Sequence, residues 1–557
     1  MFSDNATINE LTALLLAHGV RHAVTCPGSR NAPICHNMNE AGMACHPVTD
    51  ERSAAFFAIG LSQSTGEAVA LCVTSGSAIL DTSAGVAEAY YQGVPLIVIA
   101  ADRPRAWIGQ LDGQTMPQGG ALGAMARRAV DLPEGETAED LWHANRLINE
   151  ALMTATGQAR GPVLINVPLR EPLYNFNTPK LPEPRVCKRM RDNGADVVDQ
   201  VAEAMLEARR PLIVIGQTDQ AQEARLLAER WATLYEPLAS DGGEALNEAM
   251  HILRNSRRLR QEEYRPDKIL YVGGHIVSKE LKQFLRTVKG AETILVSEDG
   301  ELHDVFQNTT LVGSCDLHLL FEKLTKKTDK RDEAEKFTEN WKTLLETAKT
   351  LCRNRAGVHS QLQTVQTIIE KADGMTLHFA NSSAVRLGCM ASRKRFYCNR
   401  GINGIDGSVS TAAGHSVGRR DGLHLCVTGD LSFFYDSNAL WNAELRDNLR
   451  VVVMNNGGGG IFCRFEGLRG SEARERIVMA SHAATAKGIC LQNDVEYAEA
   501  QTPGEVEKGM EWLTVRATGS GRPRLLEIFT DSETDQRALN DYYEQIVSEY
   551  DTRMEKD

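Results

Sequence analysis

Short apolar runs recur along the chain, and each of them leads through Gly, Asp, Asn or Ser into a stretch with helical periodicity. In the first third of the chain, such runs predict strands at residues 22–26, 68–73, 96–101 and 163–167. Because the runs are largely apolar and do not alternate with polar residues, they suit parallel strands that helices cover on both faces. The pattern therefore predicts an α/β fold with parallel sheets.

The same alternation of strand and helix continues through the rest of the chain. Further strands are predicted at 212–215, 269–272, 293–296, 377–380, 395–398, 423–428, 450–454 and 524–529. Residues 178–194 are rich in Pro and charge and predict a linker, and the charged residues 321–350 are interpreted as a solvated helix or connector. A chain of 557 residues is too long for one hydrophobic core, and its length suggests three or four domains.

Composition argues against several classes of protein. The formal net charge of −13 disfavours a nucleic-acid partner, because proteins that bind nucleic acid usually have a basic surface. The longest apolar stretches are strand-sized, far from the roughly 20 residues that span a bilayer, and we expect no signal peptide because the first residues lack its basic and apolar blocks. The twelve cysteines form no CxxC pair, so free thiols in a reducing, cytoplasmic compartment are expected. For Cys26, a buried core residue is favoured over a nucleophile.

The densest chemical signal lies at residues 425–462. Asp430 ends one predicted strand, a helix is predicted at about 436–445, and the next strand runs into Asn456 and four glycines. Asp430 and Asn456 are 26 positions apart, which is one strand–helix–strand unit, so both should emerge at the carboxyl edge of neighbouring strands. Their oxygens suit Mg²⁺, and the glycines let backbone N–H groups approach a polyphosphate. A helix cap followed by a plain loop is the alternative, but the combination favours a diphosphate–Mg²⁺ site.

A second acidic residue opens a predicted helix in the first third of the chain. Asp50 can cap this helix, Glu51 stands in its first turn, and apolar residues follow at helical spacing. A Glu in the first turn is usually explained by the helix dipole. A carboxylic acid in an apolar pocket, however, has a raised pKa and can share its proton with a ring nitrogen. The aminopyrimidine ring of thiamine diphosphate requires such an acid, so we expect this cofactor to bridge Glu51 and the metal site.

With Glu51 opposite Asp430 and Asn456, the chain resembles the thiamine-diphosphate enzyme superfamily, and within it the 2-succinyl-5-enolpyruvyl-6-hydroxy-3-cyclohexene-1-carboxylate (SEPHCHC) synthase family. The matching segments are PGSR at 27–30, DER at 50–52, VTSGSA at 73–78, ADRP at 101–104, REPLY at 170–174, NSSAVR at 381–386, NRGINGIDGSVSTAAG at 399–414, GDLSFFYDSNAL at 429–440 and NNGGGGIF at 455–462. The patterns NRGxxGIDGxxSTAAG and GDLSxxYDxNAL are specific to this family. A relative such as acetolactate synthase usually has GDG where this chain has Gly429-Asp430-Leu431.

The resemblance implies both a fold and a reaction. The fold consists of three domains of doubly wound, mostly parallel sheets: a pyrimidine domain at 1–180, a central domain at 195–350 and a diphosphate- and metal-binding domain at 355–557. The reaction, in menaquinone (vitamin K2) biosynthesis, is decarboxylation of 2-oxoglutarate on thiamine diphosphate with Mg²⁺ or Mn²⁺. The resulting succinyl-semialdehyde carbanion then adds 1,4 to isochorismate. Such a transferase is expected to be a homodimer or homotetramer with the cofactor at the subunit interface.

The resemblance also implies a role for each site residue. Glu51 would activate the aminopyrimidine, and the metal would be bound by Asp430, Asn456 and the carbonyl of Gly458. Further cofactor contacts would come from Ile405, Gly429, Leu431, Ser432, Ile461 and Phe462. The residues implied for 2-oxoglutarate are Ser382, Arg386 and Arg400, and those implied for isochorismate are Ser29, Arg30, Arg103, Gln114 and Lys279. The implied catalytic residues are Glu51, Arg30, Gln114, Arg386 and Arg400.

Elementary chemistry agrees with the substrate assignment. The two substrates carry four carboxylates between them, and arginine binds carboxylate bidentately. Arg30 and Arg103 follow strand ends in the first domain, and Arg386 and Arg400 lie in turns of the last, so we expect the four to converge on one cleft. A surface ion pair is the alternative for any single arginine.

Two other functions stay open from the sequence. A different thiamine-diphosphate-dependent 2-oxo-acid decarboxylase, or an acetolactate-type carboligase, would use an uncharged acceptor and would not need Arg30 and Arg103. A non-catalytic scaffold would not need Glu51, which is present. One departure from the family pattern concerns the second substrate: Glu280, next to Lys279, is an acid where a second base is expected.

Overall fold

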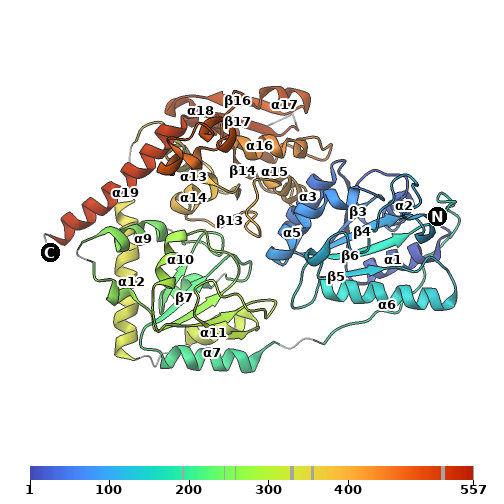
Figure 1. Ribbon diagram of the computed structural model, residues 1–557, viewed down its shortest axis with the longest axis horizontal. Helices are drawn as coiled ribbons and strands as arrows, with labels where there is room; N and C mark the ends of the chain where they lie inside the picture. The colour runs from blue at the N-terminus through green and yellow to red at the C-terminus, as the bar shows by residue number, and fades with distance from the viewer. Residues whose placement is uncertain are drawn as a thin grey trace.

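The computed structural model describes residues 1–190, 193–221, 223–243, 245–257, 259–326, 331–352, 357–515 and 521–555. These residues form three sheets whose strands are all parallel, with helices on both faces of each sheet (Figure 1). The predicted fold class is therefore confirmed. The predicted domain boundaries stay predictions, and residues 355 and 557, where the last domain was expected to begin and end, lie outside the described residues.

The first sheet has the strand order β2-β1-β3-β4-β6-β5. Its strands are β1 (His22–Thr25), β2 (Ala44–Pro47), β3 (Val69–Val73), β4 (Leu96–Asp102), β5 (Arg128–Asp131) and β6 (Val163–Pro168). Its helices are α1 (Ala6–Ala17), α2 (Ala32–Glu40), α3 (Glu51–Thr65), α4 (Ala78–Asp81), α5 (Ser83–Gln92) and α6 (Ala138–Ala155). Side chains of α1, α2 and α6 cover one face, and those of α3 and α5 cover the other, so the sheet is doubly wound.

The central sheet has the strand order β11-β10-β9-β7-β8. Its strands are β7 (Pro211–Ile215), β8 (Ala232–Tyr235), β9 (Lys268–Val272), β10 (Glu292–Val296) and β11 (Thr309–Gly313). Its helices are α7 (Ala195–Glu207), α8 (Ala224–Ala228), α9 (Leu246–Asn255), α10 (Lys279–Arg286), α11 (Leu317–Lys326) and α12 (Asp332–Leu351). One face packs against α7, α8 and α11, and the other packs against α9, α10 and α12.

The last sheet has the strand order β13-β12-β14-β15-β17-β16, which is the order of the first sheet when strands are counted from the first of each. Its strands are β12 (Thr376–Phe379), β13 (Phe396–Tyr397), β14 (His424–Gly429), β15 (Leu449–Asn455), β16 (Glu496–Ala500) and β17 (Arg524–Phe529). Its helices are α13 (Gln361–Lys371), α14 (Ser383–Ala391), α15 (Ser408–Gly418), α16 (Asp430–Tyr435), α17 (Lys487–Gln492), α18 (Pro503–Thr514) and α19 (Ser532–Met554). The first and last thirds therefore share an architecture.

The first and last domains are joined by a close crossing of α3 and α15 (Figure 1). A Cβ atom on Gly60 would lie 1.8 Å from the carbonyl oxygen of Thr411, and a Cβ on Gly414 would lie 1.9 Å from that of Phe57. Only glycine lets two helix backbones approach this closely. The crossing therefore fixes the start of α3, where Glu51 lies, relative to the last domain of the same chain.

The helix predicted at about 436–445 is wrong. It begins instead at Asp430, as α16, and a 3₁₀ turn at Ser437–Leu440 follows it. The helix ends early because the buried carboxylate of Asp436 accepts hydrogen bonds from the amide (2.8 Å) and the hydroxyl (2.6 Å) of Ser410. Ser410 lies in the first turn of α15, so a partner from a distant part of the chain ends the helix.

For the described part of residues 321–350, which excludes residues 327–330, the interpretation as a solvated helix or connector is right about the helix and wrong about its solvation. This part forms the end of α11 and most of α12. In α12, Phe337, Trp341 and Leu344 are buried in a core that the central and last domains share. The charged residues occupy the outer face of the same helix, because apolar residues recur at helical spacing on the inner face.

The segment at 178–194 contains no helix or extended strand among its described residues, and it runs along the molecule to α7 as predicted for a linker (Figure 1). Residues 191 and 192 of this prediction lie outside the described residues. The strands that have no counterpart among the predicted apolar runs are all edge strands: β2, β5, β8, β11 and β16. Edge strands are short or partly polar, so they lack the uninterrupted apolar run by which the other strands were predicted. Among the described residues, the longer helices are all too polar to cross a bilayer.

Candidate active site

Asp430 and the glycine loop meet at the carboxyl edge of the last sheet, where their spacing predicts them. β14 and β15 are neighbouring strands, with Gly429 opposite Met454. Asp430 follows Gly429 and is only 3% exposed. Its Oδ2 accepts a hydrogen bond from the Gly458 amide (2.9 Å), and its Oδ1 accepts one from the Leu431 amide (2.7 Å). Burial raises the pKa of Asp430, so the carboxylate occupies an environment that a bound cation would stabilise.

The loop after β15 needs glycine at its tightest point. Gly458 has a φ of +148°, and a Cβ there would lie 2.7 Å from the carbonyl oxygen of Met479. Asn456, just before the glycines, donates through Nδ2 to Oδ2 of Asp535 (3.1 Å). Because its amide nitrogen is engaged in this way, the amide oxygen of Asn456 is the atom that can coordinate a cation.

Asp535, on α19, is a residue of this site that the sequence did not reveal. Its carboxylate also accepts hydrogen bonds from the Thr530 hydroxyl (2.9 Å) and the Gln361 amide (2.7 Å). These contacts hold the carboxylate in place against the amide of Asn456. α19 contains many acidic residues, so only its packing against the turn after the glycine loop distinguishes Asp535 from the others.

His482 is a second residue that the sequence did not reveal. Its amide donates to the Gly457 carbonyl oxygen (2.9 Å), and its Nδ1 accepts from the Ala484 amide (3.1 Å). The proton is therefore on Nε2, which lies 3.4 Å from Oδ2 of Asp430. Nε2 is buried and has no hydrogen-bond partner among the described residues. A buried nitrogen that makes no hydrogen bond and only a long contact with a carboxylate, beside a glycine loop, is suited to donate to an anionic ligand.

The apolar residues expected beside the cofactor flank the same edge. Ile461 and Phe462 lie on the 3₁₀ turn Gly460–Arg464, directly after the glycines, and both are partly exposed. The hydroxyl of Ser432 donates to the carbonyl oxygen of Ile405. This hydrogen bond ties the loop that carries Ile405 to the first turn of α16, which carries Asp430.

Glu51 begins α3, as predicted, and Asp50 caps the helix by accepting from the Ser53 amide (2.9 Å). Burial raises the pKa of Glu51, which is half-buried. Its neighbours contact the end of α16 and the turn after it in the same chain: Oδ2 of Asp50 accepts from Asn438 (2.7 Å), and Arg52 donates to the Tyr435 carbonyl (2.6 Å). Glu51 therefore lies where the first and last domains meet.

Cys26 follows β1 and lies near Glu51, whose charge acts on its thiol. It is buried, and burial raises the pKa of its thiol well above the usual range. A thiol that resists ionisation is a poor nucleophile, as expected of the core residue that the sequence favours.

Arg30 and Arg103 come together at the carboxyl edge of the first sheet. Arg30 is buried and donates to the Leu169 carbonyl oxygen (3.1 Å) and to Oε1 of Glu171 (2.9 Å). Arg103 lies 3.7 Å from the same oxygen of Glu171 and 3.9 Å from Asp112. Two of the four arginines therefore lie together, and each also has an ion-pair partner within the chain. Convergence of all four on one cleft stays a prediction.

Ser29 and Gln114 lie in loops of the same domain. The Ser29 carbonyl accepts from the Tyr174 hydroxyl (3.2 Å). Gln114 has a left-handed φ of +55°, and its Cα lies 3.2 Å from where a Cβ on Gly76 would stand. The structure thus places Gln114 against the VTSGSA segment.

The other basic residues gather between the central and last domains. The pKa of Arg386 is lowered to about 10 by burial and by the charges of Arg464 and Arg400. Burial and the charges of Arg464 and Arg386 also lower the pKa of Lys279. Glu280 interacts with both Lys279 and Arg386, so it offsets the positive charge of this group. Lys279 therefore belongs to this second group and not to the group of Arg30, and Arg464 is a member that the sequence did not reveal.

Ser382 and Arg400 lie in turns of the last domain. Ser382 has a strained backbone, and Arg400 is hydrogen-bonded to Asn381. Ser382 occupies the position before α14 with a φ of +71°, a conformation that costs free energy for a residue with a side chain. Arg400 donates to Oδ1 of Asn381 (2.9 Å), and Asn381 donates to the Gly404 carbonyl oxygen (2.7 Å). Backbone strain of this kind is common where a protein positions a functional group.

Glu88, on α5, links the two domains that carry the arginines. Its buried carboxylate accepts from the amides of Gly401 (2.6 Å) and Ile402 (2.9 Å). Those residues follow Arg400 directly, so a side chain of the first domain fixes the loop that carries Arg400 and Ile405. The sequence did not reveal this contact, because the partners lie more than 300 positions apart.

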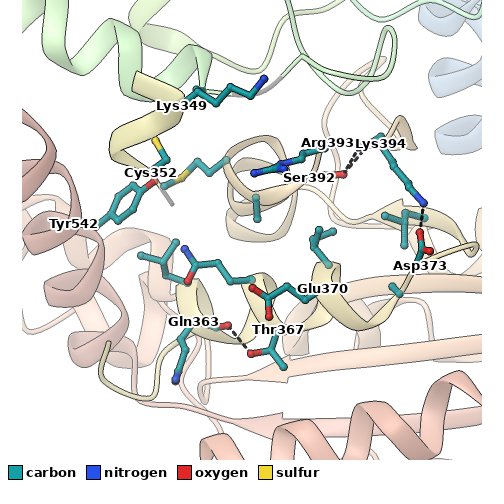
Figure 2. Close-up of a pocket in the computed structure, with 18 residues that line it drawn as sticks. Lys349, Cys352, Gln363, Thr367, Glu370, Asp373, Ser392, Arg393, Lys394 and Tyr542 are labelled. Carbon is teal, nitrogen blue, oxygen red and sulfur yellow. Dashed lines mark hydrogen bonds and ion pairs between the residues drawn. The ribbon is translucent and has the colours of Figure 1, made fainter. Parts of the chain in front are cut away.

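A cavity of about 700 Å³ lies elsewhere, between α12, α13, α14 and α19 (Figure 2). Its polar lining includes Gln363, Thr367 and Glu370 of α13, and an ion pair between Lys394 and Asp373. The residues predicted for the cofactor and the substrates are absent from its described lining. The cavity is therefore separate from the candidate active site.

Comparison with known proteins agrees with the geometry. Residues 7–122 match the family model described as thiamine pyrophosphate enzyme, N-terminal TPP binding domain. Relatives named 2-succinyl-5-enolpyruvyl-6-hydroxy-3-cyclohexene-1-carboxylate synthase align along the whole chain. The relative from Bacteroides thetaiotaomicron is 38% identical over 98% of this chain and 100% of its own length, and the relative from Bacteroides fragilis is 40% identical over the same shares.

Solved structures share the fold at low sequence identity. Benzoylformate decarboxylase from Polynucleobacter necessarius superposes with a TM-score of 0.72 at 16% identity, over 96% of this chain and 99% of that chain. The thiamine diphosphate-dependent 4-hydroxybenzoylformate decarboxylase of Rhodococcus jostii RHA1 has a TM-score of 0.70 at 18% identity, over 94% and 99%. At this identity the likeness establishes the fold alone.

Proposed function

Because this chain belongs to the 2-succinyl-5-enolpyruvyl-6-hydroxy-3-cyclohexene-1-carboxylate (SEPHCHC) synthase family, we propose that it decarboxylates 2-oxoglutarate with thiamine diphosphate and adds the resulting four-carbon carbanion to isochorismate. The reaction releases CO₂ and belongs to menaquinone biosynthesis. The observation that carries the proposal is the meeting of Asp430 with the glycine loop at one sheet edge. The twelve cysteines are all described and none of them is in a disulfide, which suits a cytoplasmic enzyme.

The residues at this edge fit a diphosphate and a divalent cation. Asp430, the amide oxygen of Asn456 and the Gly458 carbonyl are hard oxygen donors of the kind that Mg²⁺ or Mn²⁺ prefers. A Cβ at residue 458 would lie 2.7 Å from the Met479 carbonyl oxygen and would fill the loop. The buried Nε2 of His482 lacks a hydrogen-bond partner among the described residues. We assign the metal to the three oxygens and propose that His482 donates to a diphosphate oxygen.

Glu51 is proposed to hold the proton at the ring nitrogen of the aminopyrimidine. When bound, thiamine diphosphate supplies a ring carbon that attacks a 2-oxo acid and stabilises the negative charge left by CO₂. Burial raises the pKa of Glu51, which favours a protonated carboxyl that can donate to a ring nitrogen. Ile405, Ile461 and Phe462 would exclude water from the reacting end of the cofactor.

The site is proposed to be completed by a second copy of the chain. Several apolar side chains of the last domain are exposed: Ile402 and Ile405 are each 42% exposed, Tyr435 52% and Trp441 60%. Large exposed apolar patches mark interfaces, and we propose that these side chains contribute to one. We therefore propose a homo-oligomer in which Glu51 of one copy faces Asp430 of another.

The two groups of basic residues are proposed to hold the substrate carboxylates. Arg386 and Arg400, with Ser382, would bind 2-oxoglutarate next to the cofactor. Arg30 and Arg103 would bind isochorismate, with Ser29 and Gln114 beside it, because arginine recognises carboxylate through two parallel hydrogen bonds. The charges of Arg386 and Arg400 act on Lys279, so Lys279 lies near the proposed 2-oxoglutarate site. We propose that it contacts isochorismate at the boundary between the two substrate sites.

The proposed reaction is tested by product identification. The purified chain is supplied with thiamine diphosphate, Mg²⁺, 2-oxoglutarate and isochorismate, and the product is identified by mass. A parallel reaction contains pyruvate in place of 2-oxoglutarate. The proposal expects the succinylated cyclohexene product only with 2-oxoglutarate. An acetolactate-type product from pyruvate would assign the chain to a different reaction, and no turnover of either acid by cofactor-loaded protein would indicate a scaffold.

A further inference from the structure

Three histidines meet inside the last domain, at the opposite end of β14 from Asp430. His378 lies on β12, His415 on α15, and His424 is the first residue of β14. All three are buried, with 3%, 1% and 0% of their surfaces exposed. One ring nitrogen from each histidine lies within 4.8 Å of the corresponding nitrogens of the other two. These residues have no part in the proposed reaction.

The nitrogens are spaced and oriented as metal ligands are. Nδ1 of His415 lies 3.2 Å from Nδ1 of His424. Two imidazole nitrogens on one tetrahedral Zn²⁺, with bonds of roughly 2.0–2.1 Å, would lie about 3.3 Å apart. Nε2 of His424 donates to the Arg419 carbonyl oxygen (2.7 Å), so its lone pair is on Nδ1. A backbone carbonyl often orients a metal-binding histidine in this way.

Hydrogen bonding within the protein accounts for only part of the group. Nδ1 of His415 lies within hydrogen-bond distance of Nδ1 of His424, but Nε2 of His378 and Nε2 of His415 are buried and lack a hydrogen-bond partner among the described residues. A neutral imidazole has one nitrogen with a lone pair, and that nitrogen can bind a cation. A buried polar atom without a partner is costly, and a cation bound by Nε2 of His378 would remove that cost for this atom.

The surroundings restrict the kind of ion. Tyr397 stacks on His378 with ring centroids 5.2 Å apart. The charged side chains that act on His415 and His424 are Arg395, Arg419 and Asp421. The ligands available are thus imidazoles without a carboxylate, which suits Zn²⁺ and not Mg²⁺. We propose that His378, His415 and His424 form a buried structural Zn²⁺ site that joins β12, β14 and α15.

The test measures metal content and coordination in the cofactor-loaded chain. Protein is produced in medium with Zn²⁺, exchanged into thiamine diphosphate and Mg²⁺, and analysed for bound metals by mass spectrometry. The expected content is about one Zn²⁺ per chain. Protein produced with Co²⁺ in place of Zn²⁺ should show the intense visible absorption of tetrahedral cobalt. The proposal would be overturned if the wild-type chain contained less than a tenth of an equivalent of Zn²⁺. It would also be overturned if the Co²⁺ protein showed the weak absorption of octahedral cobalt.

Two sets of variants locate the ion. His378→Phe keeps a ring in the core but removes one ligand, and it should reduce the Zn²⁺ content at least tenfold. Tyr397→Phe is the matched control, because it alters the neighbouring ring without removing a nitrogen, and it should retain the ion. Asp430→Ala should also retain it. Loss of Zn²⁺ from Asp430→Ala would assign the ion to the other edge of the sheet and refute the site. If circular dichroism shows that His378→Phe is unfolded, the cobalt spectra of wild type and Asp430→Ala decide the question.

Discussion

The buried guanidinium of Arg30 donates a 2.9 Å hydrogen bond to the carboxylate of Glu171, whose side chain is 68% exposed. Arg103 lies 3.7 Å from the same oxygen. A single exposed carboxylate therefore occupies the place where two arginines converge. We propose that a carboxylate of isochorismate binds at this place and either replaces Glu171 or shares the arginines with it.

The first prediction concerns Arg30. Arg30→Ala should lower kcat/KM for isochorismate roughly 30- to 700-fold, since truncating one partner of a buried charge pair costs about 2–4 kcal/mol. The loss should appear mainly as a raised KM for isochorismate, measured by steady-state kinetics at saturating 2-oxoglutarate. Glu171→Gln is the matched control, because it leaves the guanidinium in place, and it should not raise that KM. An unchanged KM in Arg30→Ala would remove Arg30 from the isochorismate site.

The second prediction concerns Glu51. Glu51→Gln should lower the rate about 10²- to 10⁴-fold, which is the usual range for a lost acid–base group. It should also stabilise the fold at neutral pH. The pKa of Glu51 is raised in the folded chain, so ionisation of the carboxylate opposes folding, and this cost disappears as the pH falls below its ordinary pKa of 4.5.

Thermal unfolding of Glu51→Gln and wild type at a series of pH values measures this effect. The difference in stability between the two should shrink as the pH falls towards 4.5 and should have disappeared below it. Glu139→Gln is the control, because Glu139 occupies the first turn of α6 but is exposed. It should lower stability by about 0.3–1 kcal/mol through the lost helix-dipole interaction. A destabilised Glu51→Gln at neutral pH would contradict the argument from burial.

The third prediction concerns cofactor and metal binding. Thiamine diphosphate and Mg²⁺ together should raise the unfolding temperature of the wild-type chain, because a ligand at about 100 times its Kd adds about 2.7 kcal/mol to the stability of the folded state. Removal of Mg²⁺ with a chelator should abolish the shift. Asp430→Ala should show no shift with both ligands present. A shift of wild-type size in Asp430→Ala would place the cofactor elsewhere.

The fourth prediction concerns Asp535, which acts through Asn456 and is therefore a positioning residue. Asp535→Asn replaces an acceptor by a group that can also donate, so the amide of Asn456 should lose its fixed orientation. The apparent Kd for Mg²⁺ should rise about 10- to 100-fold, as for other residues that orient a metal ligand. Mg²⁺ titration of the thermal shift measures it. Asp541→Asn, at an exposed position of the same helix, should leave the Kd unchanged. Equal values for the two variants would refute the role of Asp535.

The fifth prediction concerns the crossing of α3 and α15. Gly60→Ala should destabilise the chain by about 1–3 kcal/mol or more, because the added methyl group would overlap the Thr411 carbonyl oxygen. Gly488→Ala is the matched control in α17, where a Cβ would meet no atom within 4 Å. It should leave stability unchanged or raise it through helix propensity. Denaturant unfolding measures both, and similar stabilities would mean that the helices can separate without cost.

Local patterns in the sequence determined the central strands, the shared sheet edge and the start of the helix that carries Glu51. The apolar runs predict the central strands because a buried parallel strand needs an uninterrupted apolar stretch, and that requirement is visible within five or six residues. The spacing of Asp430 and Asn456 predicts one shared edge, because parallel strands joined by a helix end on the same side. The position of Glu51 at the start of a helix follows in the same way from Asp50 and the apolar residues after it.

Tertiary structure alone decided which polar groups meet. α16 ends at Asp436 because Ser410 binds it, and Asn456 is oriented by Asp535 of a helix 79 positions away. The three buried histidines come from two strands and a helix. Any apolar neighbour stabilises a buried apolar side chain, so a local sequence pattern is enough to encode its burial. A hydrogen bond or a metal ligand needs one particular partner at one distance, and only the folded chain brings that partner into place.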